Sequence, residues 1–240
     1  MTIANYVKIV TALSALIFQL NNAQAAGMVP QASVVIVEES DGEGVIDIKN
    51  TDADAAMLLT HIQNIPEDQE SLVTISPPVA RVEPGKSQRV RFIITNTTPL
   101  KTERLKRVTF EGIPPHLKDE SKLKITFVQN LPVIIRPAGL KQELAAWEKL
   151  TWTLTKSTLE VNNPSPYVVR LGQGVQTLPD NTAWTLPRTY VLPGETLAIK
   201  PDNNKIAGDT QYVRISPATT WGFTVNSYDA PVINAGCNDC

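Results

Sequence analysis

The feature that most constrains this chain is a series of short, strand-length segments separated by turn-forming residues. Apolar and polar residues alternate in these segments, which is the period of a strand with one buried face. Clusters of Pro, Gly, Asn and Asp bound them and break regular structure. In the first half, strands are predicted at residues 33–37, 45–48, 57–65, 90–95, 107–110 and 123–135. No helical pattern lies between them, which indicates an all-β sandwich.

A domain boundary is predicted at residues 136–140, where Pro137 and Gly139 end a strand. After it comes a second series of strand-like segments, and one short stretch, 142–150, has a helical pattern. We therefore predict an N-terminal domain at 26–137 and a C-terminal domain at 138–240. Each has about 100 residues, enough to bury a core without disulfide bonds.

Residues 1–25 have the layout of a secretory signal peptide. Lys8 precedes an apolar run at 9–20, and Ala23-Gln24-Ala25 provides the small residues of a cleavage site. The run is too short to span a membrane, which takes about 20 residues. A buried N-terminal helix is the alternative interpretation. The leader predicts export across the inner membrane to the periplasm.

The sequence contains no recognisable catalytic or metal-binding motif. Its net charge of −2 argues against a nucleic-acid partner. The two histidines, His61 and His116, have no ligand spacing and no nucleophile motif around them, so we predict no enzyme, no cofactor and no metal. Cys237 and Cys240 lack the second pair that a four-thiolate zinc site needs, so we predict a small disulfide in an oxidising compartment.

The most informative segment is Leu123-Lys124-Ile125-Thr126-Phe127. Its period of two places Leu123, Ile125 and Phe127 on one face of a strand. That face could fill the protein's own core, or an exposed edge strand could offer it to another chain. The alternation by itself is compatible with both interpretations.

Four segments, residues 76–91, 110–115, 134–141 and 161–167, together resemble the PapD-like periplasmic pilus chaperones in order and spacing. The resemblance implies two immunoglobulin-like β-sandwich domains in an angled, boomerang arrangement with a cleft between them. It implies that Leu123, Ile125 and Phe127 belong to a strand lent to a pilus or fimbrial subunit. It also implies that Glu103 and Arg136 form an interdomain salt bridge. The family's third partner, an acidic residue of the second domain, has no match near 212–216.

The resemblance fails at the basic residues that anchor the subunit's terminal carboxylate. The family has an Arg on the first strand and a Lys on the donated strand. These positions fall here at Ser33 or Val34, and at Pro132. Arg136, Lys124 or Arg107 could supply a substitute charge. Pro132 also removes a backbone donor, so we expect the strand to end or bulge there.

The leading hypothesis is a periplasmic chaperone that caps pilus subunits by donor-strand complementation and delivers them to an outer-membrane usher. A divergent chaperone-like binding or structural module without the carboxylate anchor is the second hypothesis. A secreted β-sandwich hydrolase is the third. Without a client, an exposed donor strand could pair with a second copy in a self-capping homodimer.

Overall fold

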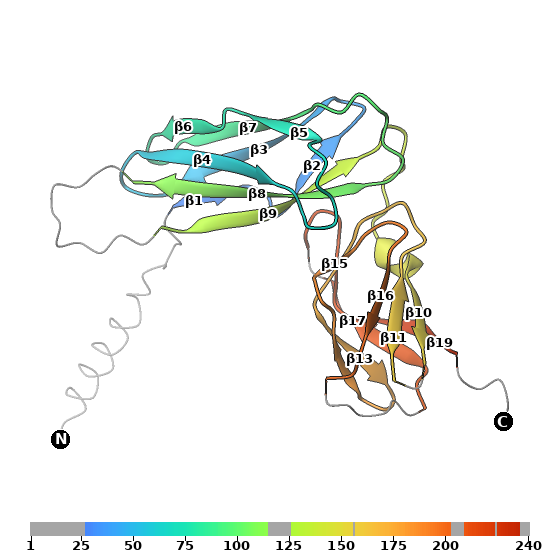
Figure 1. The fold of residues 1–240 in the computed structure, drawn as a ribbon. Helices are drawn as coiled ribbons and strands as arrows, with labels where there is room; N and C mark the ends of the chain where they lie inside the picture. The colour runs from blue at the N-terminus through green and yellow to red at the C-terminus, as the bar shows by residue number, and fades with distance from the viewer. Residues whose placement is uncertain (1–26, 115–125, 156, 203–208, 224, 236–240) are drawn as a thin grey trace, which may run out of the picture.

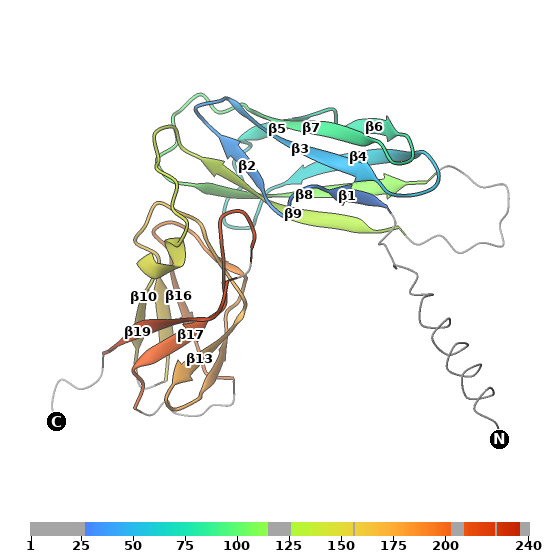
Figure 2. The same cartoon turned by 180° about the vertical axis from the view of Figure 1, so that it is seen from behind.

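The computed structural model describes residues 27–114, 126–155, 157–202, 209–223 and 225–235. Nearly all regular structure in these residues is β-strand. Figure 1 shows two strand-rich domains set at a marked angle, the first lying across one end of the second, and Figure 2 shows the same angle from behind. The predicted all-β fold with two angled sandwich domains is confirmed.

The first domain contains nine strands connected by hydrogen bonds in the order β5-β7-β3-β2-β9-β8-β4-β6, with β1 beside β3. The strands are β1 (Met28–Pro30), β2 (Val35–Glu38), β3 (Glu43–Asn50), β4 (Ala56–Gln63), β5 (Val73–Ser76), β6 (Val79–Val82), β7 (Ser87–Ile94), β8 (Arg104–Ile113) and β9 (Val128–Arg136).

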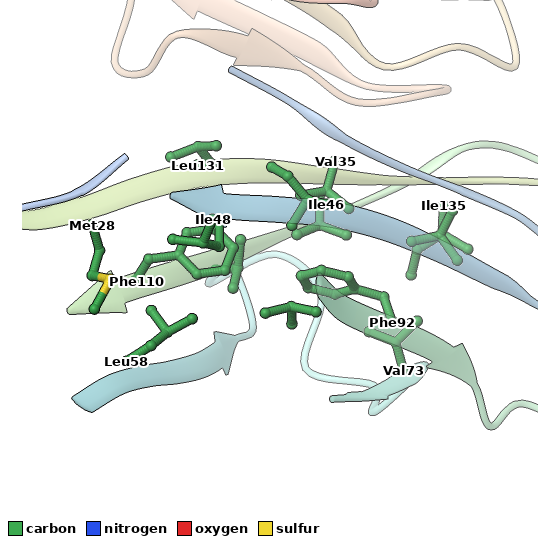
Figure 3. Close-up of a cluster of buried hydrophobic side chains, with 14 of the residues drawn as sticks. Met28, Val35, Ile46, Ile48, Leu58, Val73, Phe92, Phe110, Leu131 and Ile135 are labelled. Atoms are coloured by element: carbon green, nitrogen blue, oxygen red, sulfur yellow. The ribbon is translucent and has the colours of Figure 1, made fainter. Parts of the chain in front are cut away.

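The core of this domain is filled by the inward row of each strand. In β3, for example, burial alternates along the strand, and Ile46 and Ile48 point inward. They meet Phe92 of β7 and Phe110 of β8, which are both wholly buried (Figure 3). A buried large apolar side chain contributes about 1.5–3 kcal/mol. The apolar residues at alternate positions of the sequence are thus the ones that form this core.

The first two strands, β1 and β2, pair with different strands, and this leaves part of one edge of β9 without a partner among the described residues. β1 pairs antiparallel with β3, whereas β2 pairs parallel with β9. The β2 pairing covers β9 only from Val133 to Arg136. β9 pairs with β8 from Val128 to Ile135. The opposite edge of β9, from Val128 to Pro132, therefore has no strand partner among the described residues.

β9 runs without interruption through Pro132. Its antiparallel register with β8 is continuous and places Pro132 opposite Arg107. The expectation that the strand ends or bulges at this proline is wrong. Proline lacks a backbone donor, but an antiparallel pair does not use a donor at every position, and Pro132 lies just before the β2 pairing begins.

The second domain contains a seven-stranded sheet, β14-β13-β17-β19-β10-β11-β16, and a three-stranded sheet, β15-β12-β18. Its core includes the buried Trp152 and Trp184. The predicted helical stretch at 142–150 forms only a short 3-10 helix, η1 (Ala146–Lys149). The strands are β10 (Thr151–Leu154), β11 (Leu159–Asn162), β12 (Val169–Leu171), β13 (Gly174–Leu178), β14 (Ala183–Thr185), β15 (Tyr190–Val191), β16 (Thr196–Ile199), β17 (Tyr212–Ile215), β18 (Pro217–Ala218) and β19 (Tyr228–Asn234).

Two classes of feature are absent from the described residues. No helix there has the length and apolar character needed to cross a membrane. No group of three or more His, Cys, Asp or Glu side chains in that part of the chain is arranged to hold a metal ion.

Candidate binding site at the domain junction

A buried ion-pair network lies where β9 ends. The parallel register of β2 and β9 places Glu38 opposite Arg136, and Glu103 directly precedes β8, the other neighbour of β9. Arg136 Nη1 lies 2.6 Å from Glu38 Oε1, and Arg136 Nε lies 3.1 Å from Glu103 Oε1. The side chains of Arg136 and Glu103 are only 5% and 3% exposed. The structure thus brings the two residues together and adds Glu38.

Glu103 also connects the two domains through backbone hydrogen bonds. Its Oε2 accepts from the N–H of Val168 at 2.9 Å, and its own N–H donates to the carbonyl of Pro166 at 2.8 Å. Burial raises the pKa of Glu103; the bonds from Val168 and Arg136 act in the opposite direction without cancelling the effect of burial. A carboxylate held by both domains restrains the angle between them.

Apolar packing and a second polar contact extend this junction. Val34, Leu105 and Ile134 of the first domain pack with Val168 of the second in one buried cluster. Farther along, the hydroxyl of Tyr190 donates to Glu67 at 2.8 Å, and Arg188 also pairs with Glu67. The junction is therefore a packed interface with specific polar contacts.

The loop that carries Glu67 is held by a buried cation. Lys106 of β8 is 1% exposed, and its Nζ lies 2.9 Å from Asp68 Oδ1. Arg104 Nε donates to Asp68 Oδ2 at 2.7 Å. Burial alone would raise the pKa of Asp68, but the bonds from Arg104 and Lys106 outweigh it and hold the pKa below its usual value.

A cleft of about 780 Å³ opens beside the junction. One wall is the open edge of β9, residues 129–132, together with the chain between β1 and β2. The other wall comes from the second domain and includes Arg170, Trp221 and Phe223. The Ser33 hydroxyl donates to the carbonyl of Trp221 at 3.3 Å, so the segment between β18 and β19 reaches the first domain, as Figures 1 and 2 show.

The described part of the predicted subunit-binding row is exposed. Phe127, directly before β9, is 60% exposed, and Val128 is 53% exposed. Phe127 has the same parity as Leu131, Val133 and Ile135, which point into the core. Two more members of the row, Leu123 and Ile125, lie outside the described residues, as do Lys124, His116, Cys237, Cys240 and the predicted leader, 1–25.

Sequence reasoning missed three participants in the buried network, namely Glu38 and the backbone groups of Val168 and Pro166. Glu38 takes the place of the acidic residue expected from the second domain, which contributes backbone groups instead. A usable signal for Glu38 was its position at the end of an apolar segment of strand length. The backbone contacts of Val168 and Pro166 carry no residue signature, because any residue type has these groups.

Comparison with known proteins identifies the family. Residues 27–141 match the model "Pili and flagellar-assembly chaperone, PapD N-terminal domain", and residues 145–226 match "Pili assembly chaperone PapD, C-terminal domain". The uncharacterized fimbrial chaperone YhcA of Escherichia coli strain K12 is 42% identical over 208 residues, which is 86% of this chain and 91% of that protein. The chain belongs to the PapD-like fimbrial chaperones of the chaperone–usher pathway.

Solved structures show the same fold. The Salmonella enterica SafA pilin in complex with the SafB chaperone matches with a TM-score of 0.70 at 17% identity, covering 87% of this chain and 98% of that one. The Pseudomonas aeruginosa CupB2 chaperone matches with a TM-score of 0.67 at 22% identity, covering 85% of this chain and 100% of that one. These structures share the two-domain fold, and the family itself is identified by the sequence matches above.

Proposed function

We propose that this protein captures pilus or fimbrial subunits in the periplasm by donor-strand complementation and delivers them to an outer-membrane usher. The supporting observation is the open edge of β9 from Val128 to Pro132, which begins at an exposed apolar side chain, Phe127. Such an edge can take up one extended strand from another chain. The chemistry is binding; no catalytic step and no cofactor is part of this proposal.

In this proposal, Leu123, Ile125 and Phe127 form the row that enters the subunit. Burying three such side chains gives roughly 5–9 kcal/mol before ordering losses are subtracted. Glu103 and Arg136 hold the two domains at the angle that subunit binding requires. The proposal places the boundary between the domains at Pro137–Ala138, and the bond from the N–H of Ala138 to Glu39 Oε2, at 2.9 Å, supports it.

Three further expectations belong to the same proposal. Residues 1–25 direct export and are removed. Cys237 and Cys240 form a disulfide in the oxidising periplasm. When no subunit is present, the open edge of β9 pairs with that of a second copy, which covers the same apolar row in a homodimer.

The test is an affinity pull-down of the tagged protein from periplasm in which fimbriae are expressed, with mass spectrometry of what co-elutes. We expect one small β-sandwich subunit near one-to-one. Ile125→Ser with Phe127→Ser should abolish its recovery without unfolding the chaperone, because Phe127 is already mostly exposed. The matched control is Val45→Ser, at another exposed strand position. Undiminished recovery with the double variant refutes the donor role.

A second candidate is a divergent binding module that does not recognise a chain terminus. Ser33, Val34 and Pro132, at the expected anchor positions, favour it because none carries a charge. Recovery of partners that lack an accessible C-terminal strand would support this module over the chaperone.

A further inference from the structure

The cleft beside the junction contains two cations that have no role in the network described above. Arg107 projects from β8 and Arg170 from β12, and both line the large cleft and an adjoining cavity of about 370 Å³. Pro132 also lines both, so the arginines lie where the two spaces meet. Of the described residues that line either space, these arginines are the only charged ones.

Both guanidinium groups have donors to spare. Arg107 Nε donates to Asn130 Oδ1 at 2.8 Å, and its Nη2 donates to the Asn130 carbonyl at 2.9 Å, which holds the group against β9. Arg170 has no ion pair in the described part of the chain, and its Nη1 is buried without a hydrogen-bond partner. Arg136 Nη2 is also buried without a partner, but Arg136 has two carboxylates beside it, whereas Arg170 has none among the described residues. Because buried donors in native proteins are nearly always paired, the Arg170 donor points to a ligand.

The electrostatics of the pair also favour an anion. Burial lowers the pKa of Arg107, while the nearby Tyr190 acts in the opposite direction. Burial lowers the pKa of Arg170 as well, and the positive charge of Arg107 lowers it further. A carboxylate between the two groups would reverse the repulsion, and guanidinium and carboxylate form strong, directional hydrogen bonds.

The strand pairing indicates which anion arrives there. A chain that adds to β9 has an open edge only as far as Pro132, because β2 occupies the edge from Val133 onward. The added strand must therefore end or leave beside the arginines. Two cations repel an amino terminus and attract a carboxyl terminus. A strand whose carboxyl end lies at Pro132 runs parallel to β9.

We propose that Arg107 and Arg170 together bind the C-terminal carboxylate of the polypeptide held on β9. The proposal rests on the donor-strand function above and gives that site its anchoring residues, which differ from the expected positions Ser33, Val34 and Pro132. Because β8 and β12 belong to different domains, the bound carboxylate connects both. Trp221 and Phe223, 45% and 72% exposed, offer apolar contact at the mouth of the same cleft.

The experiment uses the full exported chain and a fluorescent peptide that copies the last fifteen residues of the subunit recovered in the pull-down. The peptide is made with a free C-terminal carboxylate and as the amide, and anisotropy gives both affinities. We expect the acid to bind at least about tenfold more tightly. Arg107→Gln and Arg170→Gln should each remove most of that difference. Arg81→Gln, at an exposed residue paired with Glu83, should leave it unchanged.

A second substitution separates the charge of Arg170 from its planar geometry, and a second peptide separates a chain terminus from a side-chain carboxylate. Arg170→Lys keeps the charge but loses the planar fork, so it should retain part of the preference for the acid. An amidated peptide ending in Glu should bind like the plain amide if the chain terminus itself is recognised. Equal affinity of acid and amide for the unmodified protein overturns the anchor. If Phe127→Ser then still weakens both peptides, the donor function stands without it.

Discussion

Arg136, which is buried, and Arg170, which is half-buried with a buried Nη1, lie at the same domain junction, and their surroundings differ. Arg136 lies between Glu38 and Glu103, at 2.6 and 3.1 Å, and is 5% exposed. Arg170 faces a second arginine, and its Nη1 has no hydrogen-bond partner in the described part of the chain. Arg136 thus has two carboxylates beside it, although its own Nη2 is also buried without a hydrogen-bond partner among the described residues, whereas Arg170 has no anion there. A buried cation with its anions built in maintains structure, and one without them is available for a ligand.

The position of each arginine explains the difference. Arg136 lies at the end of β9, and both β2 and β8 pair with that strand. Glu38 at the end of β2 and Glu103 just before β8 therefore reach Arg136 from opposite sides. Arg170 lies on the facing domain, across from Arg107, where the edge of β9 is open. The open edge and the unpaired charge therefore occur together, as expected of a surface that receives another chain.

The largest expected effect is on the completed network. Arg136→Met removes the cation and leaves Glu38 and Glu103 close together, so we expect a loss of about 3–5 kcal/mol in the free energy of unfolding. Urea unfolding at neutral pH measures it. The deficit should shrink at acidic pH, because Glu103, whose pKa burial raises, binds a proton as the pH falls. Arg89→Met, at an exposed ion pair with Asp47, is the matched control and should change the free energy of unfolding far less.

The second largest effect is expected where the buried cation Lys106 loses its carboxylate partner. Asp68→Asn leaves Lys106 without its carboxylate, and we expect a loss of about 2 kcal/mol in unfolding free energy at neutral pH. The pKa of Asp68 is held below its usual 3.8. Its contribution is therefore present above that value and is lost as the pH falls through the folded-state pKa.

The pH dependence provides the check on this second prediction. The difference between Asp68→Asn and the unmodified protein should be largest at neutral pH and should narrow below about pH 3.8. Asp47→Asn, which breaks a more exposed pair, is the matched control and should show little difference at either pH. An equally large deficit for Asp68→Asn at acidic pH would contradict the assignment of its stabilisation to charge.

The smallest effect should have the opposite sign. Arg170→Met removes a buried, unpaired donor group, so we expect the free energy of unfolding to rise by about 1 kcal/mol. The same chemical substitution would thus destabilise at Arg136 and stabilise at Arg170, while only the second weakens binding of a free C-terminal carboxylate. A loss of stability with Arg170→Met would show that the protein already provides a partner for this charge.

Much of the fold could be predicted because its signal is local. Alternating residues gave the inward rows of β3 and β7, and Pro137 and Gly139 marked the end of β9 before the second series of strands began. Pro132 was misread because its local rule, the missing donor, depends on which neighbours the strand has. Up to Pro132 this edge of β9 has no strand partner among the described residues, and from Val133 onward it pairs with β2. The tertiary structure alone shows this, because β1 pairs with β3 and only β2 reaches β9.

The sequence by itself indicated the all-β class, many of the strands though not, for example, β1, β5, β6, β13 or β14, and, through resemblance, the pairing of Glu103 with Arg136. It did not indicate Arg170 at all, and it offered Arg107 only as one of three substitute charges. Only the tertiary structure decided that these two arginines line the same cleft and that Glu38 forms an ion pair with Arg136. The physical reason is range: alternation and turn chemistry act between neighbouring residues, whereas the charge environment of a side chain is set by groups distant in the chain.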